Sequence, residues 1–367
     1  VQQSADAGMD LFRVFDSLNW TENMRVAMDA VLETGKLLEA AICYTGDISD
    51  PDRSKYDLKY YVTLARELKA AGAHILCIKD MAGLCKPAAA ATLVKALKKE
   101  TGLPIHFHTH DTSGIAAASV LAAIEAGADA VDAAMDSLSG LTSQPNLGAI
   151  AEALRNSPRD TLLDSAALRG ISTYWEHVRN LYGGFEADFR SGASEVYTHE
   201  IPGGQYTNLR QQARSMGIDA RWPEVAATYA KVNEMFGDII KVTPTSKVVG
   251  DLTLMMITGG ISPEDILSPD KEIAFPDSVV SFFRGDIGQP HGGFPTQLQK
   301  KVLKGAAPLS VRPGAEMADV DLAATKVEAE HKIGRKISDQ ELSSYTMYPT
   351  VFADYAAERR VYGNDAH

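Results

Sequence analysis

The chain has 367 residues, of which 45% are hydrophobic and 23% charged, and its formal net charge is -12 at pH 7. These values predict a globular protein of one large or two medium domains, and the acidic balance argues against nucleic acid as a partner. No apolar run is long enough to span a membrane, and no basic-then-apolar signal segment opens the sequence. The three cysteines, Cys43, Cys77 and Cys85, suit a reducing compartment, so we expect the cytoplasm, or the mitochondrial matrix in a eukaryote.

Over residues 1–157, short apolar runs alternate with amphipathic runs, a pattern typical of parallel βα units. Strands are predicted over 11–15, 37–45, 74–80, 104–110 and 130–135. Helices are predicted over 56–72, 87–102 and 114–128, each with a glycine near its end, and the first eight residues read as the end of a helix. The similar segments AGMD, AGAH and AGAD precede three of the strands. This recurrence predicts an α/β fold of the TIM (β/α)8-barrel type.

The remaining residues, 158–367, show no strand alternation. Helices are predicted over 168–182, 208–217, 222–237, 247–260 and 319–334, separated by turns rich in glycine and proline. We therefore expect a barrel part over 1–157 and a mostly helical region over 158–367 that packs over the barrel mouth.

The fourth predicted strand carries three histidines, His106, His108 and His110, in the segment GLPIHFHTHDTSG. Alternate residues of a strand share a face, so all three point the same way. Two histidines two positions apart at a strand end are able to bind one metal ion, but they also occur as ordinary polar residues at a barrel mouth. The spacing alone leaves both interpretations open. His106 lies deeper and is interpreted as a packing or supporting residue.

Lys79 ends the apolar third strand, next to Asp80. A lysine inside an apolar barrel has a lowered pKa, and its neutral amine is able to form a Schiff base or to take up CO2 as a carbamate. The structural alternative is an ion pair with Asp80 or Asp16. The carbamate is favoured by the histidines on the next strand, because its oxygen is an anionic ligand that complements two neutral imidazoles. A Schiff-base aldolase stays an alternative.

Three further segments lie in the helical region. The segment VTPTSKVVGD, with Thr243, Ser246 and Lys247, is favoured as a plain helix start with Thr/Ser capping and a proline in the first turn. The segment IPGGQYTNL reads as a Gly-Gly turn into a helix, and the amides of Gln205 and Asn208 are able to hold a polar ligand. The segment FFRGDIGQPHGGFP is a glycine-rich connector without P-loop spacing, so we assign it no phosphate role.

Taken together, seven segments resemble, in order, the carboxyltransferase domain of pyruvate carboxylase. They are LFRVFDSLN, CIKDMAGL, HFHTHDTSG, DAAMDSLSGLTSQPN, PGGQYTNL, VTPTSKVVGD and RGDIGQPHGGFPTQLQKKVLKG. The resemblance covers essentially the whole chain. The HxH pattern is shared by a wider barrel superfamily, whereas the late segments look like pyruvate carboxylase in particular.

The resemblance implies a reaction and a set of site residues. Carboxybiotin arrives on a mobile carrier domain, and its carboxyl group passes to pyruvate to give oxaloacetate. His108 and His110 match the metal-binding histidines, and Lys79 matches the lysine whose carbamate completes the ligand set. Thr243 matches the threonine that moves a proton from the pyruvate methyl group to biotin.

The same resemblance places other residues around the two reactants. Ser246, Lys247 and Gln205 would line the biotin pocket, and Asp16 would lie at the substrate end as a further catalytic residue. The implied cofactors are a divalent metal, Zn or Mn, and biotin carried on another domain, with ATP and bicarbonate used elsewhere in the full enzyme. The implied assembly is a homo-oligomer, a tetramer in the intact enzyme.

Some family features do not occur in this sequence. They are the metal-binding aspartate of the DAHQS-type motif, the arginine and glutamine that hold pyruvate, the biotin carboxylase domain and the AMKM-type biotinyl lysine. We therefore interpret the five strands as strands 4–8 of the barrel within a longer protein. Alone, the chain is expected neither to close a barrel nor to turn over. Formation of oxaloacetate by this chain alone would contradict that expectation.

Other functions remain open at this point. A biotin-dependent oxaloacetate decarboxylase or transcarboxylase subunit would share the barrel and the metal. A lyase or aldol-type synthase of the same superfamily would have no need for the TPTSK segment beside biotin. A helical assembly module with an inert barrel is the non-enzymatic alternative.

Overall fold

A computed structural model describes residues 1–186 and 189–363. Its strands form one parallel sheet in sequence order, and a helix follows each of the first four. The strands are β1 (Leu11–Val14), β2 (Leu37–Cys43), β3 (Ile75–Asp80), β4 (Ile105–Thr109) and β5 (Ala130–Val131). The helices among them are α2 (Thr21–Glu33), α3 (Leu58–Ala70), α4 (Pro87–Thr101) and α5 (Ala116–Glu125), and α1 (Gln2–Asp6) precedes them. The predicted TIM-barrel type and its five strands are confirmed, and β1 and β5 are the edges of the sheet within the described residues.

The two faces of the sheet differ in polarity, and this difference positions the site. One face carries apolar residues such as Leu76, Ile78 and Phe107, which pack with helices α3 and α4 in the main hydrophobic core. The other face carries the polar residues, because Cys77 pairs in register with His106 and Lys79 with His108. The alternation of the strand thus separates the core from the functional side chains.

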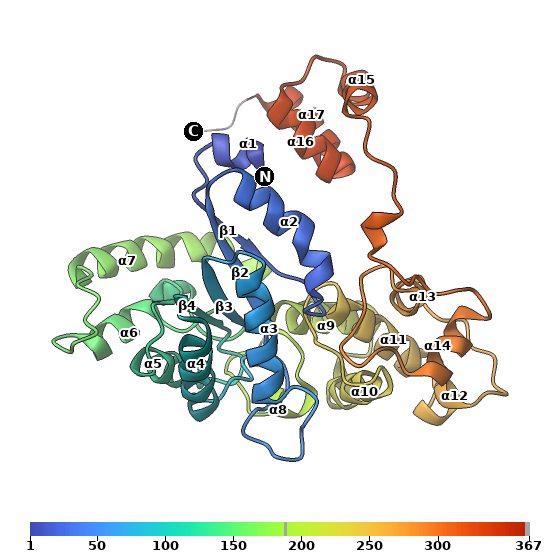
Figure 1. Ribbon diagram of the computed structural model, residues 1–367, viewed down its shortest axis with the longest axis horizontal. Coiled ribbons are helices and arrows are strands. Elements are labelled where there is room, and N and C mark those ends of the chain that lie inside the picture. The colour runs from blue at the N-terminus through green and yellow to red at the C-terminus, as the bar shows by residue number, and fades with distance from the viewer. Residues whose placement is uncertain (187–188, 364–367) are drawn as a thin grey trace.

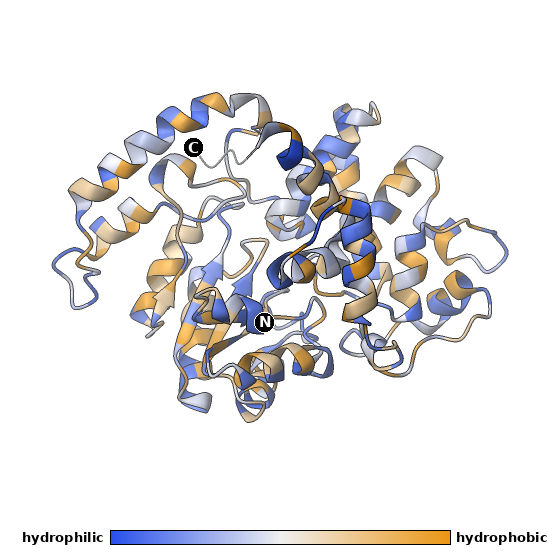
Figure 2. Ribbon diagram, turned by 90° about the horizontal axis from the view of Figure 1, so that it is seen from above, coloured by the Kyte–Doolittle hydropathy of each residue, from blue (hydrophilic) through white to orange (hydrophobic). Residues whose placement is uncertain are grey.

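The chain beyond β5 is mostly helical, in agreement with the helical region predicted from residue 158 onward, and Figure 1 shows much of it beside the sheet. Its helices are α6 (Leu147–Leu154), α7 (Ser165–Leu181), α8 (Val196–His199), α9 (Gly203–Ser215), α10 (Trp222–Met235), α11 (Thr245–Gly259), α12 (Pro263–Leu267), α13 (Asp277–Arg284), α14 (Thr296–Leu303), α15 (Leu322–Ile333), α16 (Asp339–Met347) and α17 (Pro349–Tyr362). Hydrophobic and hydrophilic residues alternate along them (Figure 2), as in amphipathic helices. No helix within the described residues is both long and apolar enough to cross a membrane.

The helical half has hydrophobic cores of its own. Helices α9 to α14 share one core, in which Tyr229, Phe236 and Phe282 are fully buried. Helices α15 to α17 form a small separate core around Tyr345, and α16 contacts α1 (Figure 1). The division of the chain at residue 157 into two domains stays a prediction.

Two local predictions need correction. The Gly-Gly pair is not a turn before a helix, because α9 begins at Gly203 itself and includes both glycines. Helix α11 begins at Thr245 with Pro244 as N-cap and has no side-chain cap. The Thr245 hydroxyl instead lies 2.7 Å from the Ile240 carbonyl oxygen and accepts a hydrogen bond from the Val242 N–H.

Candidate active site

The histidine pair at the end of β4 is arranged for a shared cation. His108 donates from Nδ1 to Asp132 Oδ2 at 2.7 Å, and His110 donates from Nδ1 to the Thr142 carbonyl oxygen at 2.6 Å. These acceptors select tautomers in which both Nε2 atoms keep a free lone pair. The two Nε2 atoms lie 3.3 Å apart. Two nitrogens bound tetrahedrally to one ion, with bonds of about 2.0–2.1 Å, lie about 3.3–3.4 Å apart, so the pair fits a metal.

Burial keeps one of these imidazoles neutral. It lowers the pKa of His110 to about 4, which leaves the ring unprotonated near pH 7. Within residues 1–186 and 189–363, no group of three or more His, Cys, Asp or Glu side chains is placed to hold a metal ion, so the pair needs a further ligand of another kind or from outside the described residues.

Lys79 lies on the strand next to this pair. It is only 8% exposed, and burial lowers its pKa. Its Nζ lies 2.8 Å from the Met81 sulfur and 4.7 Å from the centre of the Phe15 ring, and it has no ion-pair partner among the described residues. Burial thus favours the neutral amine, which is the form that adds to CO2 to give a carbamate.

The alternative ion pair of Lys79 with a neighbouring aspartate is absent from the described residues. Asp80 accepts hydrogen bonds from the backbone of Leu84 and Cys85 and from the Thr109 hydroxyl. The Asp16 carboxylate likewise accepts hydrogen bonds from backbone groups. Both aspartates therefore already have partners in loops. That leaves Lys79 free for another role.

Asp16, predicted at the substrate end, stabilises the loop after β1. Its Oδ1 accepts from the backbone N–H of Leu18 at 2.8 Å and of Trp20 at 3.0 Å, and its Oδ2 accepts from Asn23 at 2.8 Å. These bonds account for its burial without any substrate. Its catalytic role stays a prediction.

A layer of charged residues below the pair was missed from the sequence. His106 lies 2.8 Å from both Glu39 Oε2 and Asp132 Oδ1, and Arg13 contacts the same two carboxylates. Burial disfavours the charged imidazole, but these hydrogen bonds outweigh it and raise the pKa of His106 to about 9. A protonated imidazole has no lone pair for a metal, which supports a supporting role for His106.

A signal for this layer was present in the sequence. Each of Arg13, Glu39 and Asp132 is a single charge within or directly after an apolar strand run. Such charges are rarely buried without partners, so three of them in apolar strand runs indicate that they pair with one another. Asp132 is the most consequential, because it also orients His108.

The residues predicted for biotin gather between α9 and α11. Gln205 and Lys247 line one cavity of about 370 Å³ together with Asn208. Ser246 is 1% exposed, and its hydroxyl has no hydrogen-bond partner among the described residues. Lys247 is paired with Asp251 at 2.5 Å. Three of the predicted side chains therefore lie on two packed helices, and only two of them share the cavity.

The start of α9 connects this cavity with the histidine pair. The Gly203 N–H donates to the Met81 carbonyl oxygen at 2.9 Å. A Cβ on Gly203 would lie 3.0 Å from His110 Nδ1. Thr243 lies in the exposed turn that precedes α11. The helical half thus reaches the carboxyl ends of the strands.

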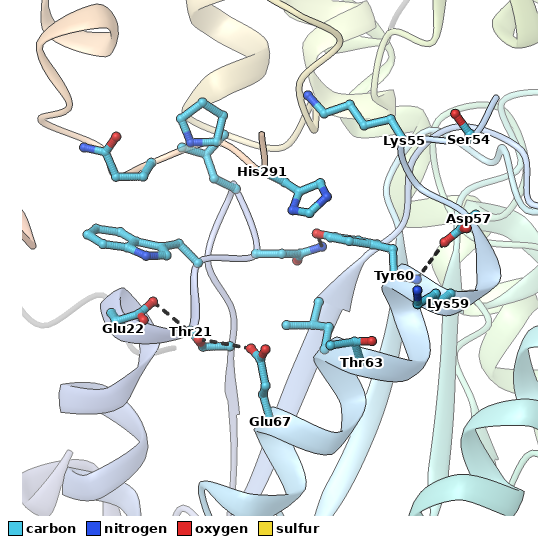
Figure 3. Close-up of a pocket in the computed structure, with 16 residues that line it drawn as sticks. Thr21, Glu22, Ser54, Lys55, Asp57, Lys59, Tyr60, Thr63, Glu67 and His291 are labelled. Carbon is cyan, nitrogen blue, oxygen red and sulfur yellow. Dashed lines mark hydrogen bonds between the residues drawn. The ribbon is translucent and has the colours of Figure 1, made fainter. Parts of the chain in front are cut away.

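A different cavity, of about 630 Å³, lies between the loop before α2, helix α3 and residues 289–291 (Figure 3). Trp20, Tyr60 and His291 line it with several carboxylates and lysines. None of the predicted site residues belongs to it, so it does not bear on the site.

Known protein families match both parts of the chain. The model of a conserved carboxylase domain matches residues 196–367, and an HMGL-like model matches residues 15–174. Pyruvate carboxylase of Bacillus subtilis is 51% identical over 364 residues, which is 99% of this chain and 32% of that protein. The human mitochondrial pyruvate carboxylase is 50% identical over 351 residues, 95% of this chain and 30% of that protein.

Solved structures agree with these relatives. The carboxyl transferase domain from Rhizobium etli pyruvate carboxylase, solved with pyruvate and biocytin, matches with a TM-score of 0.97 and 62% identity over 99% of this chain and 61% of that chain. The complete Rhizobium etli enzyme has the same TM-score and identity, over 36% of its chain. The chain spans about a third of the length of the curated relatives that it matches.

Proposed function

The chain belongs to the pyruvate carboxylase family, and from this premise we propose that it provides the carboxyltransferase half-reaction of a biotin-dependent ligase. In this reaction the carboxyl group of carboxybiotin passes to pyruvate and gives oxaloacetate. The observation that carries the proposal is the pair of facing imidazoles beside a buried lysine with a lowered pKa. The curated relatives named above favour this reaction over that of an oxaloacetate decarboxylase.

A divalent ion, zinc or manganese, would be held by His108, His110 and the carbamate of Lys79. When bound, it would polarise the pyruvate carbonyl group and stabilise the negative charge that develops on its oxygen when the methyl group loses a proton. Lys79 forms the carbamate when its neutral amine adds to CO2 and releases a proton to solvent. Asp132 and the Thr142 carbonyl keep the two imidazole rings in the tautomer that a metal requires.

The other site residues handle the proton and the biotin ring. Gln205, Lys247 and Ser246 hold the ring near the turn that carries Thr243. After the carboxyl group leaves biotin as CO2, Thr243 donates its hydroxyl proton to biotin and accepts a proton from the pyruvate methyl group. A hydroxyl is able to do both, because it is donor and acceptor at once. The pyruvate enolate then attacks CO2, and oxaloacetate forms.

Further partners follow from the same premise. The proposal requires a biotin carrier domain as a moving partner, and ATP and bicarbonate at another domain. We also propose a homotetramer, located in the cytoplasm of a bacterium or in the mitochondrial matrix of a eukaryote.

The deciding experiment removes the proposed proton carrier in the complete enzyme. Thr243→Ala is expected to abolish oxaloacetate formation almost completely while bicarbonate-dependent ATP cleavage continues. Thr258→Ala, a substitution near the far end of α11, is the control and is expected to keep full activity. Full activity in Thr243→Ala would refute the proposed mechanism.

A further inference from the structure

A cluster of four charged side chains lies between the barrel part and the helical part. It consists of Arg53, Glu200, Asp238 and Lys241, and we call it the buried ion cluster. Lys241 Nζ lies 2.8 Å from Glu200 Oε2 and 3.7 Å from Asp238 Oδ1. Arg53 forms an ion pair with Glu200 and lies 3.6 Å from Asp238 Oδ2. The two positive and two negative charges balance.

The centre of the buried ion cluster is shielded from water. Lys241 is 4% exposed and Glu200 is 6% exposed. Burial disfavours the charged Glu200 carboxylate, but Lys241 and Arg53 outweigh it and hold its pKa at about 2. The Glu200 carboxylate is thus charged in the interior, where its ion pair with Lys241 is costly to disrupt.

The cluster joins segments that are far apart in the sequence. Arg53 belongs to the loop between β2 and α3, and Lys241 Nζ also donates to the Thr45 hydroxyl at 3.2 Å, just beyond β2. Glu200 is the C-cap of α8 and comes three residues before Gly203, which packs against His110. Lys241 comes two residues before Thr243.

The backbone between Lys241 and Thr243 is itself held firmly. Val242 donates its N–H to the Thr245 hydroxyl at 3.1 Å, and that hydroxyl lies 2.7 Å from the Ile240 carbonyl oxygen. These bonds connect the backbone on either side of Lys241 to Thr245 at the start of α11, next to the turn that carries Thr243.

We propose that Lys241 and Glu200 are positioning residues that hold the Thr243 hydroxyl at the correct depth over the histidine pair. The inference rests on the proposed function. Neither residue touches the reactants. Their ion pair fixes the turn that carries Thr243 against the segment that leads to Gly203, which packs against His110. Loss of the pair therefore impairs the proton transfer by Thr243 more than any other step.

The test uses Lys241→Met in the complete enzyme, with Lys231→Met as control because Lys231 forms only an exposed pair with Glu234. We expect kcat for pyruvate carboxylation to fall about 10- to 100-fold in Lys241→Met, the loss associated with misplacing a reacting group by about 1 Å. Bicarbonate-dependent ATP cleavage and bound metal should stay at the control level. The kinetic isotope effect with methyl-deuterated pyruvate should rise, because proton transfer becomes rate-limiting.

A double variant separates positioning from a merely structural role. If Lys241 acts through Thr243, then Lys241→Met should cost almost nothing further in a Thr243→Ala background. An unchanged isotope effect, or equal losses in both backgrounds, would overturn the inference. If Lys241→Met does not fold, the pair Lys241→Met with Glu200→Gln removes both charges and is judged by the same readouts.

The two proposals fail in different ways. An active Thr243→Ala enzyme refutes the proposed function itself. An inactive Thr243→Ala enzyme together with a fully normal Lys241→Met enzyme refutes only the positioning role.

Discussion

Gly203 offers a direct perturbation of the histidine pair. It lies in the first turn of α9, where an added Cβ would be 2.9 Å from the Thr142 carbonyl oxygen and 3.0 Å from His110 Nδ1. These two atoms form the 2.6 Å hydrogen bond that fixes the His110 tautomer. Gly203→Ala therefore places a methyl group against that bond while leaving every other site residue in the sequence unchanged.

The magnitude follows from the size of the overlap. An ordinary Cβ contact begins at 3.4 Å, so the carbonyl oxygen and the ring have to yield by about 0.5 Å. A misplacement of about 1 Å is able to cost roughly 100-fold, and loss of a partner that orients a metal ligand costs about 10- to 100-fold in affinity. We expect metal affinity to fall about 10-fold, or about 1.4 kcal/mol.

The measurement is a competition titration of the metal-free complete enzyme against a chromophoric chelator. Gly204→Ala is the matched control, because it lies in the same turn and its Cβ would meet nothing within 4 Å. Alanine favours a helix over glycine, so both variants share any gain in helix stability. Equal metal affinity in the two variants would refute the link between Gly203 and His110.

Three other predictions test different parts of the site. Gly250→Ala brings a Cβ to 2.7 Å from Gln205 Nε2, so it should displace that amide and raise the KM for free biotin several-fold in biotin-dependent oxaloacetate decarboxylation, with metal content unchanged. Lys79→Ala should lose most of its bound metal by elemental analysis, and acetate should restore part of it by replacing the carbamate oxygens; no loss of metal would exclude the carbamate ligand. The Glu200 carboxylate, with its pKa lowered from 4.5 to about 2, should stabilise the fold by roughly 3 kcal/mol above pH 4.5 and lose this contribution as the pH falls toward 2. Urea unfolding should accordingly show the full difference in free energy of unfolding between the wild type and Glu200→Gln at pH 6, and this difference should become smaller below pH 4.5. A difference that does not change with pH would contradict the assignment.

The fold was predictable because its signals are local. Buried strands such as β3 are continuous apolar runs, and α4 is bounded by Pro87 at its start and Gly102 in a left-handed conformation at its end. The alternation of His108 and His110 likewise needs only the two-residue repeat of a strand. These features depend on neighbours in sequence, so the sequence contains them in readable form.

The parts that could not be predicted depend on partners distant in sequence. Asp132 orients His108 only because β4 and β5 are neighbours, and Glu39 becomes a partner of His106 only across two strand pairings. The sequence predicts a turn at Gly203 because two adjacent glycines disfavour a helix. In the structure, the contact with His110 and the hydrogen bond to Met81 hold Gly203 in the helix. Nothing in the sequence around Lys241 indicates that its side chain is buried in an ion pair.

The burial of His110 and Lys79 has a consequence for competition between ligands. An imidazole or amine in water has to lose its proton before it binds a metal or CO2, so its affinity for these ligands rises steeply with pH. In this protein the interior has already expelled the proton from His110 and weakened its hold on Lys79. At His110, folding rather than metal binding therefore supplies the free energy of deprotonation, and metal binding by this ring should be nearly independent of pH around neutrality. At Lys79, burial makes deprotonation easier, but carbamate formation still releases a proton and should be favoured by higher pH.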